Sequence, residues 1–246
     1  MNTKLKKSIY LLLFLTLIFS GFIAFNYKVK ADKKEDVSDK KEIYLTFDDG
    51  PSDKTTENIL DVLKENDVKA TFFIVGKYVE GREDVLKRIV KEGHSLGLHT
   101  YSHNYKTIYE NNKIFIDEML KCQNEIYRAT GVKTNIIRFP GGSVKRLNNE
   151  FKKELEEKGF KIYDWNMALT DGINPKAPVS KFYKEGTKRK KTLSKIILLM
   201  HCDYLNKNTC RALPDIINFY KNQGYEFKII DKNTPEFVFP YKNRND

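Results

Sequence analysis

The sequence has few cysteines and few histidines, and it shows no internal repeat. Its 246 residues include three cysteines (Cys122, Cys202 and Cys210), four histidines and one tryptophan. Three cysteines do not make a disulfide framework. Cys202 and Cys210 are close enough in sequence to pair, but free thiols are at least as good an interpretation. With only four histidines, the position of each one is informative.

Acidic residues are outnumbered by basic ones. The chain has 33 Asp and Glu against 44 Lys and Arg, so its formal net charge is +11 and its isoelectric point is about 9.3. Such an excess indicates an anionic environment, either nucleic acid or an anionic cell wall or membrane surface. The lysines are spread along the chain, and no nucleic-acid-binding motif is present. We therefore expect no nucleic-acid partner and favour the surface.

The first 31 residues are typical of a signal peptide or an N-terminal membrane anchor. Lys4, Lys6 and Lys7 precede an apolar run at residues 9–25. The run is long for a signal-peptide core and slightly short for a spanning helix, so both alternatives stay open. A charged linker is predicted at residues 32–41, before a folded body at residues 42–246. This order predicts an extracytoplasmic body, tethered to the membrane or secreted to the cell wall.

Short apolar segments alternate with amphipathic ones along this body. Predicted strands cover residues 43–47, 70–75, 95–98, 135–139, 160–165, 196–200 and 226–230, and predicted helices cover residues 55–66, 83–91, 114–129, 148–158, 179–193 and 212–223. Such alternation is typical of parallel strands with right-handed crossovers. The length suits a single domain. Because the strands are short, we expect an α/β fold with a distorted or incomplete (β/α) barrel.

The residues with reactive side chains follow predicted strands. They are Asp48 and Asp49, His99 and His103, Arg138, Asp171, and His201. In parallel α/β folds the carboxyl ends of the strands carry the active site. We therefore expect these side chains to meet on one face. The fourth histidine, His94, precedes its strand and is better explained by structural hydrogen bonding.

His99 and His103 are four residues apart, which places two imidazoles on one face of a helical turn. Alone, such a pair is more often unremarkable than a metal site. Adding one carboxylate gives two histidines and one aspartate, a set that suits a catalytic divalent ion with open positions. Zn²⁺ is the expected metal, with Co²⁺ and Ni²⁺ as alternatives.

Four motifs together resemble the polysaccharide deacetylases of carbohydrate esterase family 4. They are Thr46-Phe47-Asp48-Asp49-Gly50, His99 with His103, Arg138-Phe139-Pro140-Gly141-Gly142, and Leu199-Met200-His201. Each motif is weak alone, but their order and spacing over residues 41–230 are specific. The resemblance implies a distorted (β/α) barrel, a divalent metal and hydrolysis of N- or O-acetyl groups on sugars.

The resemblance also implies a role for each matching residue. Asp49, His99 and His103 are similar to the family's metal ligands, and Asp48 to its general base. Arg138 matches the residue that pairs with the base, and we expect it to lower the pKa of Asp48. His201 matches the general acid. Further matches are Leu199, for the pocket of the acetyl methyl group, and the backbone N–H of Gly141, for oxyanion binding.

Two positions depart from the family pattern. Cys202 stands where the family often has an aspartate, and we expect no cysteine mechanism because no second histidine lies near it in sequence. The family also places an aspartate and a tryptophan close together to orient the acid histidine. We assign Asp171 to that role, with Asp164 as the alternative, and Trp165 to the substrate side of the site.

These features predict a metal-dependent hydrolase that removes N-acetyl groups from an extracytoplasmic polysaccharide, with N-acetylglucosamine of peptidoglycan as the leading substrate. The leader and the positive charge fit an acetylated cell-wall polysaccharide as partner. Chitin, an exported polysaccharide and O-acetyl-xylan are alternatives, as is a wall-binding module that has lost catalysis. The sequence does not indicate an oligomeric state.

Overall fold

The computed structural model describes residues 40–188 and 193–241. The described residues from Lys41 onward form one compact unit. The expected leader at residues 1–31, and all but the last two residues of the expected linker, lie outside the described residues. None of the helices in the described part of the chain has the length and hydropathy that a membrane span requires.

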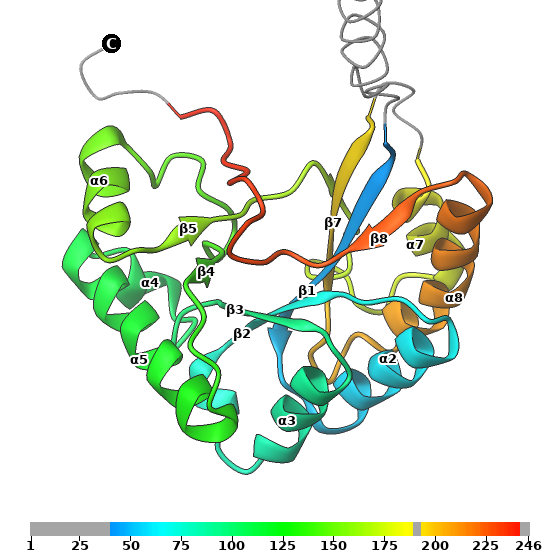
Figure 1. Ribbon diagram of the computed structural model, residues 1–246, viewed down its shortest axis with the longest axis horizontal. Helices are drawn as coiled ribbons and strands as arrows, with labels where there is room; N and C mark the ends of the chain where they lie inside the picture. The colour runs from blue at the N-terminus through cyan, green and yellow to red at the C-terminus, as the bar shows by residue number, and fades with distance from the viewer. Residues whose placement is uncertain (1–39, 189–192, 242–246) are drawn as a thin grey trace, which may run out of the picture. The chain divides into compact units, whose positions relative to one another are not determined.

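The described residues form an eight-stranded parallel sheet with helices on its outside (Figure 1). The strands are β1 (Glu42–Gly50), β2 (Thr71–Ile74), β3 (Ser95–Leu98), β4 (Ile136–Ile137), β5 (Lys161–Ile162), β6 (Met167–Ala168), β7 (Lys195–His201) and β8 (Glu226–Lys228). The helices are α2 (Asp53–Glu65), α3 (Glu83–Lys91), α4 (Tyr105–Ile108), α5 (Asn112–Thr130), α6 (Asn149–Glu157), α7 (Val179–Gly186) and α8 (Lys207–Asn222), with a 3₁₀ helix η1 (Gly76–Tyr78).

The sheet curls into an open barrel. Its strand order is β5-β4-β3-β2-β1-β7-β6, and β8 pairs with the first three residues of β1. The two edge strands, β5 and β6, follow each other in sequence but do not pair. The C-terminal segment crosses this opening, where the Asp164 N–H donates to the Phe237 carbonyl over 2.6 Å. The expected distorted (β/α) barrel is confirmed.

Alternating residues of β1 face opposite sides of the sheet, as a strand requires. Ile43, Leu45 and Phe47 belong to the main hydrophobic core. Tyr44 belongs instead to a small apolar cluster with Phe73, Ile136, Tyr163, Ile197 and Ile230. Thr46 and Asp48 follow Tyr44 on the same face, inside the barrel. The barrel interior is therefore apolar at one end and polar at the end where the strands stop.

Side chains at the helix ends explain where the main helices begin and stop. Ser52, Asn111 and Asn148 each accept a hydrogen bond from a backbone N–H in the first turn of α2, α5 and α6. Gly131 ends α5 with φ of 74°, a left-handed conformation that glycine adopts at little cost. His94 has a structural role, since its Nδ1 accepts a hydrogen bond from the Ala70 N–H over 3.1 Å.

Three predicted elements differ most from the structure. Of the predicted strand at residues 160–165, only Lys161–Ile162 forms a strand, β5, and Asp164 and Trp165 leave the sheet before β6 begins at Met167. Helix α7 ends at Gly186, before the predicted residue 193. Helix α8 begins at Lys207, five residues before the predicted start, and contains Pro214. Packing of the C-terminal segment against Asp164, which is distant in sequence, accounts for the first difference.

Candidate active site

The end of β1 directs two adjacent carboxylates toward the same place. Successive residues of a strand normally point to opposite faces. Here the register of β1 against β2 shifts between Asp48 and Gly50, and Asp49 has a left-handed φ of 69°. As a result, Nε2 of His99 lies 3.6 Å from Oδ2 of Asp48 and 3.5 Å from Oδ1 of Asp49. The bulge thus brings both carboxylates to one imidazole.

His99 and His103 come together on an irregular loop and not on a helical turn. Thr100 and His103 have left-handed φ values of 65° and 52°. The two imidazole rings lie 5.0 Å apart, centroid to centroid. Glu118, on α5, holds this loop by accepting hydrogen bonds from the N–H groups of Tyr101 and Ser102, over 3.0 and 2.6 Å. The two imidazoles were expected to lie together on a helical turn. They do lie together, but an irregular loop places them there.

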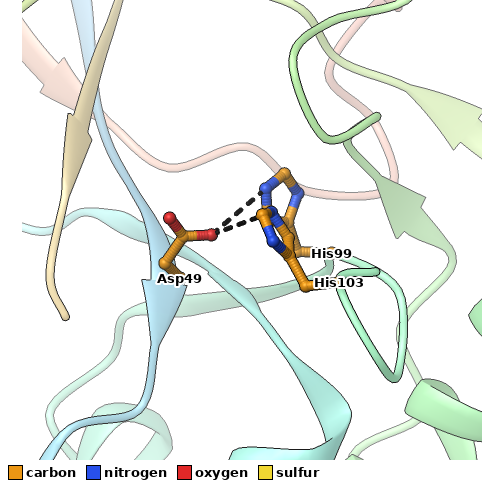
Figure 2. Close-up of side chains that lie close together, drawn as sticks. All are labelled: Asp49, His99 and His103. Carbon is orange, nitrogen blue, oxygen red and sulfur yellow. Dashed lines mark ion pairs between the residues drawn. The ribbon is translucent and has the colours of Figure 1, made fainter. Parts of the chain in front are cut away.

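Asp49, His99 and His103 form a set that fits a divalent metal (Figure 2). One ligand atom from each lies within 4.8 Å of the others, and His103 Nε2 is 3.2 Å from Asp49 Oδ1. Oδ1 of Asp49 is buried and has no hydrogen-bond partner among the described residues. A buried carboxylate oxygen without a partner is costly unless a cation satisfies it.

The electrostatics of His99 also suit a metal ligand. Burial, together with the neighbouring His103, lowers the pKa of His99 to about 3. The imidazole is therefore neutral at physiological pH, as a ligand must be. Its Nδ1 lies 3.0 Å from the Arg138 carbonyl, so Nδ1 carries the proton and the Nε2 lone pair faces Asp49.

Asp48 is held by Arg138 in the barrel interior. Oδ1 of Asp48 accepts a hydrogen bond from Nη1 of Arg138 over 2.8 Å, and both side chains are almost fully buried. Arg138 also donates to Thr46 and to the Tyr163 and Asp164 carbonyls. Burial raises the pKa of Asp48, and the Arg138 charge offsets only part of that rise. Arg138 thus lowers this pKa, as expected, but desolvation outweighs the ion pair and the pKa is raised overall.

On the other side of the site, His201 is paired with Asp171. His201 Nδ1 lies 2.8 Å from Oδ1 of Asp171, and Oδ2 of Asp171 accepts from the His201 N–H over 2.9 Å. Thr209 donates to the same Oδ2. Burial alone would lower the pKa of His201, but the hydrogen bond and charge of Asp171, helped by Asp48 and Asp49, raise it to about 9. The ring is therefore protonated at neutral pH.

Asp164, the alternative partner of His201, is engaged elsewhere. Its carboxylate accepts hydrogen bonds from the backbone N–H and the hydroxyl of Ser143 and from the Phe239 N–H. It therefore ties the loop after β4 to the C-terminal segment. The structure brings Asp171, and not Asp164, to His201.

The three residues expected on the substrate side lie around this centre. Leu199 is buried on the same face of β7 as His201, two residues before it. Trp165 is partly buried against Phe239, with its ring 5.7 Å from the Arg138 guanidinium carbon. Gly141 is exposed in a tight turn with φ of 74°, and its N–H makes no hydrogen bond to a described residue.

The comparisons with known proteins agree with this geometry. Residues 35–163, more than half of the chain, match the polysaccharide deacetylase family. The chain belongs to the polysaccharide deacetylase family. It is 35% identical over 193 residues to a peptidoglycan-N-acetylglucosamine deacetylase of Bacillus cereus, which covers 77% of this chain and 69% of the relative.

Two further comparisons place this deacetylase among its relatives. The peptidoglycan-N-acetylmuramic acid deacetylase PdaA of Bacillus subtilis is 34% identical over 193 residues, covering 78% of this chain and 71% of PdaA. The crystal structure of the polysaccharide deacetylase Bc1974 from Bacillus cereus superposes with a TM-score of 0.74 at 34% identity, covering 80% of this chain and 96% of that one. The fold and the deacetylase class are thus shared.

All three cysteines of the deacetylase are free thiols, so Cys202 and Cys210 do not pair. Cys202 lies behind the carboxylates, where its N–H and its thiol both donate to the Asp48 carbonyl, over 2.9 and 3.3 Å. Burial raises the pKa of this thiol well above its usual value. A protonated thiol facing a carbonyl is a structural group and not a nucleophile.

Two residues that support the site were not predicted. Glu118 holds the loop that carries the two histidines, and no sequence signal singles it out on its helix. Gly172 lies against the His201 ring, where an added Cβ would stand 2.5 Å from the ring. Its position directly after Asp171 is a usable signal, because a glycine beside a predicted site residue often permits a close approach.

Proposed function

We propose that the protein is a metal-dependent, extracytoplasmic deacetylase that hydrolyses the N-acetyl group of N-acetylglucosamine in peptidoglycan. One observation carries the proposal. The barrel end holds a three-residue ligand set between a buried carboxylate, Asp48, and a protonated imidazole, His201. A base and an acid on either side of a metal site are what amide hydrolysis needs.

Asp49, His99 and His103 would hold the metal, and their one oxygen and two nitrogen donors suit Zn²⁺, with Co²⁺ and Ni²⁺ as alternatives. When bound, the ion supplies Lewis-acid chemistry by polarising the acetyl carbonyl group and increasing the acidity of water. Asp49 lies at the end of β1, and His99 and His103 lie on the loop after β3, so the sheet and this loop together set their spacing.

Asp48 acts as the general base and takes the proton of the attacking water. Its raised pKa makes it a stronger base than an ordinary aspartate, and Arg138 fixes its orientation through Oδ1. The other oxygen, Oδ2, faces the metal ligands, 3.6 Å from His99 Nε2. The carboxylate is thus directed at the place where water would attack.

His201 acts as the general acid and donates a proton from Nε2 to the leaving amine nitrogen. Asp171 keeps the ring charged and oriented through Nδ1. The N–H of Gly141, which has no partner among the described residues, donates to the developing oxyanion. Leu199 contacts the acetyl methyl group, and Trp165 supplies an apolar wall for the sugar.

The choice of sugar rests on two sequence motifs. The Asp48–Asp49 pair and the Arg138–Gly142 motif resemble the glucosamine-specific group. The two curated relatives described above, one named for each sugar, are equally similar to this chain, at 35% and 34% identity. The alternative substrates are N-acetylmuramic acid, chitin, another exported polysaccharide and O-acetyl-xylan. The complete base, ligand set and acid argue against a silent wall-binding module.

The location outside the cytoplasm rests on sequence alone. The basic, apolar leader predicts export, with residues 9–25 either cleaved off or kept as a tether. The net charge of +11 favours association with an anionic wall.

The test is acetate release by the full chain from purified peptidoglycan, with and without a chelator and with zinc added back. The proposal predicts release that the chelator abolishes and zinc restores, with free amines on glucosamine that are labelled before the product is hydrolysed in acid, because acid itself removes acetyl groups. Free amines on muramic acid alone would reassign the sugar. Release that a chelator leaves intact would refute the metal mechanism, and no release from any acetylated glycan would refute the deacetylase.

A further inference from the structure

The turn after β4 carries the backbone N–H that would bind the oxyanion. Pro140 is the second of its four residues and Gly141 is the third. The Gly142 N–H donates to the Phe139 carbonyl over 2.8 Å, and Gly141 has a φ of 74°. A hydrogen bond that joins the fourth residue to the first, with a positive φ at the third, is typical of a type II turn.

The central peptide of such a turn has two possible orientations. Type I and type II turns differ by a flip of the peptide between the second and third residues, which reverses its carbonyl and its N–H. Glycine in the third position permits both, because it adopts positive and negative φ about equally readily. Here a flip would turn the Gly141 N–H to the side that the Pro140 carbonyl now faces. A contact from outside the turn is therefore needed to hold one orientation.

Tyr109 makes such a contact. It directly follows α4, and its hydroxyl donates to the Pro140 carbonyl over 2.6 Å. In a planar trans peptide the carbonyl and the N–H point in opposite directions. The hydroxyl that holds the Pro140 carbonyl therefore directs the Gly141 N–H away from Tyr109. That N–H has no partner among the described residues, so it is available to a ligand on the other side.

Aromatic packing keeps Tyr109 in place. Its ring stacks on Phe115 of α5 with the centroids 5.7 Å apart, and the guanidinium carbon of Arg146 lies 4.0 Å from its centroid. Phe115 also stacks on Phe139, the first residue of the turn, with the centroids 4.3 Å apart. Burial raises the pKa of Tyr109, so its hydroxyl stays protonated. The hydroxyl thus meets the turn from a fixed position.

A second tyrosine lies between the turn and the metal ligands. The Tyr105 ring packs edge-on against the His103 ring, with the centroids 5.3 Å apart. A Cβ added to Gly141 would stand 3.1 Å from the Tyr105 hydroxyl oxygen. The turn and the ligand His103 therefore flank the same side chain, which places the Gly141 peptide beside the ligand set.

We propose that Tyr109 is a positioning residue, whose hydroxyl holds the Pro140–Gly141 peptide in the orientation that presents the Gly141 N–H to the oxyanion. Tyr109 acts through this peptide and not on the substrate itself. The inference deepens the proposed function and rests on it, because the N–H has this task only where an acetyl group is hydrolysed.

The kinetic test is Tyr109→Phe, which removes the hydroxyl and keeps the ring. A neutral hydrogen bond shifts an equilibrium by about three- to tenfold, whereas deleting an oxyanion donor lowers kcat by about 10²- to 10³-fold. We expect kcat for acetate release from soluble peptidoglycan strands to fall by about three- to tenfold. KM and metal affinity should stay at the wild-type values, because the N–H acts in the transition state.

Tyr225→Phe is the matched control. The Tyr225 hydroxyl is also partly buried and donates to a backbone carbonyl, that of Leu193, over 2.8 Å. This residue directly precedes β8, which pairs with β1 at the end opposite the site. We expect wild-type kcat and KM. A similar fall of kcat in both variants, or no fall in Tyr109→Phe, would overturn the inference.

An NMR measurement follows the peptide without turnover. The chain has seven prolines, and only Pro140 is followed by a glycine. The full chain is labelled with ¹³C at the proline carbonyl carbons and with ¹⁵N in glycine. A spectrum that correlates each carbonyl carbon with the next N–H then contains one signal, from the Pro140–Gly141 peptide. We expect this signal to move or split in Tyr109→Phe and to stay unchanged in Tyr225→Phe.

The two proposals fail in different ways. If the wild type releases no acetate from any acetylated glycan, the proposed function is wrong and the oxyanion role of the turn falls with it. If the wild type releases acetate but Tyr109→Phe leaves either kcat or the NMR signal unchanged, the proposed function stands and the inference is overturned.

Discussion

Asp48 and Asp49 are adjacent in sequence but have opposite surroundings. Asp48 is buried and bonded to Arg138, whereas Oδ1 of Asp49 has no hydrogen-bond partner among the described residues and faces two imidazoles. Two neighbouring carboxylates repel each other. Here Arg138 stabilises the charge of Asp48, and a metal held with His99 and His103 would stabilise that of Asp49. This division of environments assigns proton transfer to the first and metal binding to the second.

Replacing Asp48 with asparagine should separate these two roles. The amide oxygen can still accept the Arg138 hydrogen bond, so the barrel and the metal ligands should persist, while the base is lost. We expect kcat to fall by about 10²- to 10⁴-fold with metal content unchanged, measured by acetate release and elemental analysis. His99→Ala is the matched comparison and should lose both metal and turnover.

Either of two results would contradict these assignments. Near wild-type turnover in Asp48→Asn would show that another group takes the proton. An unchanged metal stoichiometry in His99→Ala would show that His99 is not a ligand.

The pair of Asp171 and His201 predicts a pH dependence. Because the pKa of His201 is raised to about 9, the acid is protonated below that pH and kcat should decline as the pH rises through it. Asp171→Asn removes the main group that raises this pKa, whereas burial, which lowers it, remains. The alkaline limb of kcat should therefore move to lower pH, and profiles of kcat against pH for both proteins measure the shift. An alkaline limb at the same pH in both would refute the assignment.

At the level of elements, the loop between β3 and α4 depends on a helix that does not touch the reaction. Glu118 of α5 accepts hydrogen bonds from two N–H groups of this loop. Within the loop, Thr100 Oγ1 accepts a hydrogen bond from the His103 N–H over 3.1 Å. Two left-handed residues in the loop carry conformational strain that these bonds offset. The distance between His99 and His103 is thus set partly by α5.

Glu118→Gln should weaken the metal site without removing a ligand. An amide is a poorer acceptor for two N–H groups than a carboxylate, so the loop should loosen. We expect metal affinity to fall by about ten- to a hundredfold, measured by competition with a chromophoric chelator. Glu125→Gln, on the same helix and in a surface pair with Arg128, should bind metal as the wild type does. Equal affinities in both variants would show that α5 does not position the loop.

Much of this arrangement could be predicted from the sequence, because parallel strands alternating with helices place polar residues at one end of a sheet. Asp48, His99 and His201 follow from that rule alone. The register shift at Asp49 has no sequence pattern, although it is what brings both carboxylates to His99. The sequence assigns Asp171 to His201 but leaves Asp164 as an alternative, and only the tertiary contacts that engage Asp164 with Ser143 and Phe239 remove that alternative.

Across the whole domain, the site lies where distant parts of the chain meet. β1 pairs with β7 along seven residues and with β2 at its end. Asp48 and His201 are partners in the β1–β7 pairing, so they lie side by side. The ligand set joins the end of β1 to the loop after β3. A metal held there links two parts of the sheet that the chain connects through α2, β2, η1 and α3.

This link predicts that metal stabilises the fold as a whole. A metal that binds only the folded state raises the free energy of unfolding, by about 2.7 kcal/mol when its free concentration is a hundred times the dissociation constant. For a domain of this size we expect zinc to raise the melting temperature of the chelator-treated protein by about 5–10 °C. Asp49→Asn and His103→Ala should show little of this rise, because each removes a ligand. A rise of the same size in all three proteins would mean that zinc stabilises the domain at another place, and no rise in the wild type would mean that the ligand set does not hold metal in the folded state.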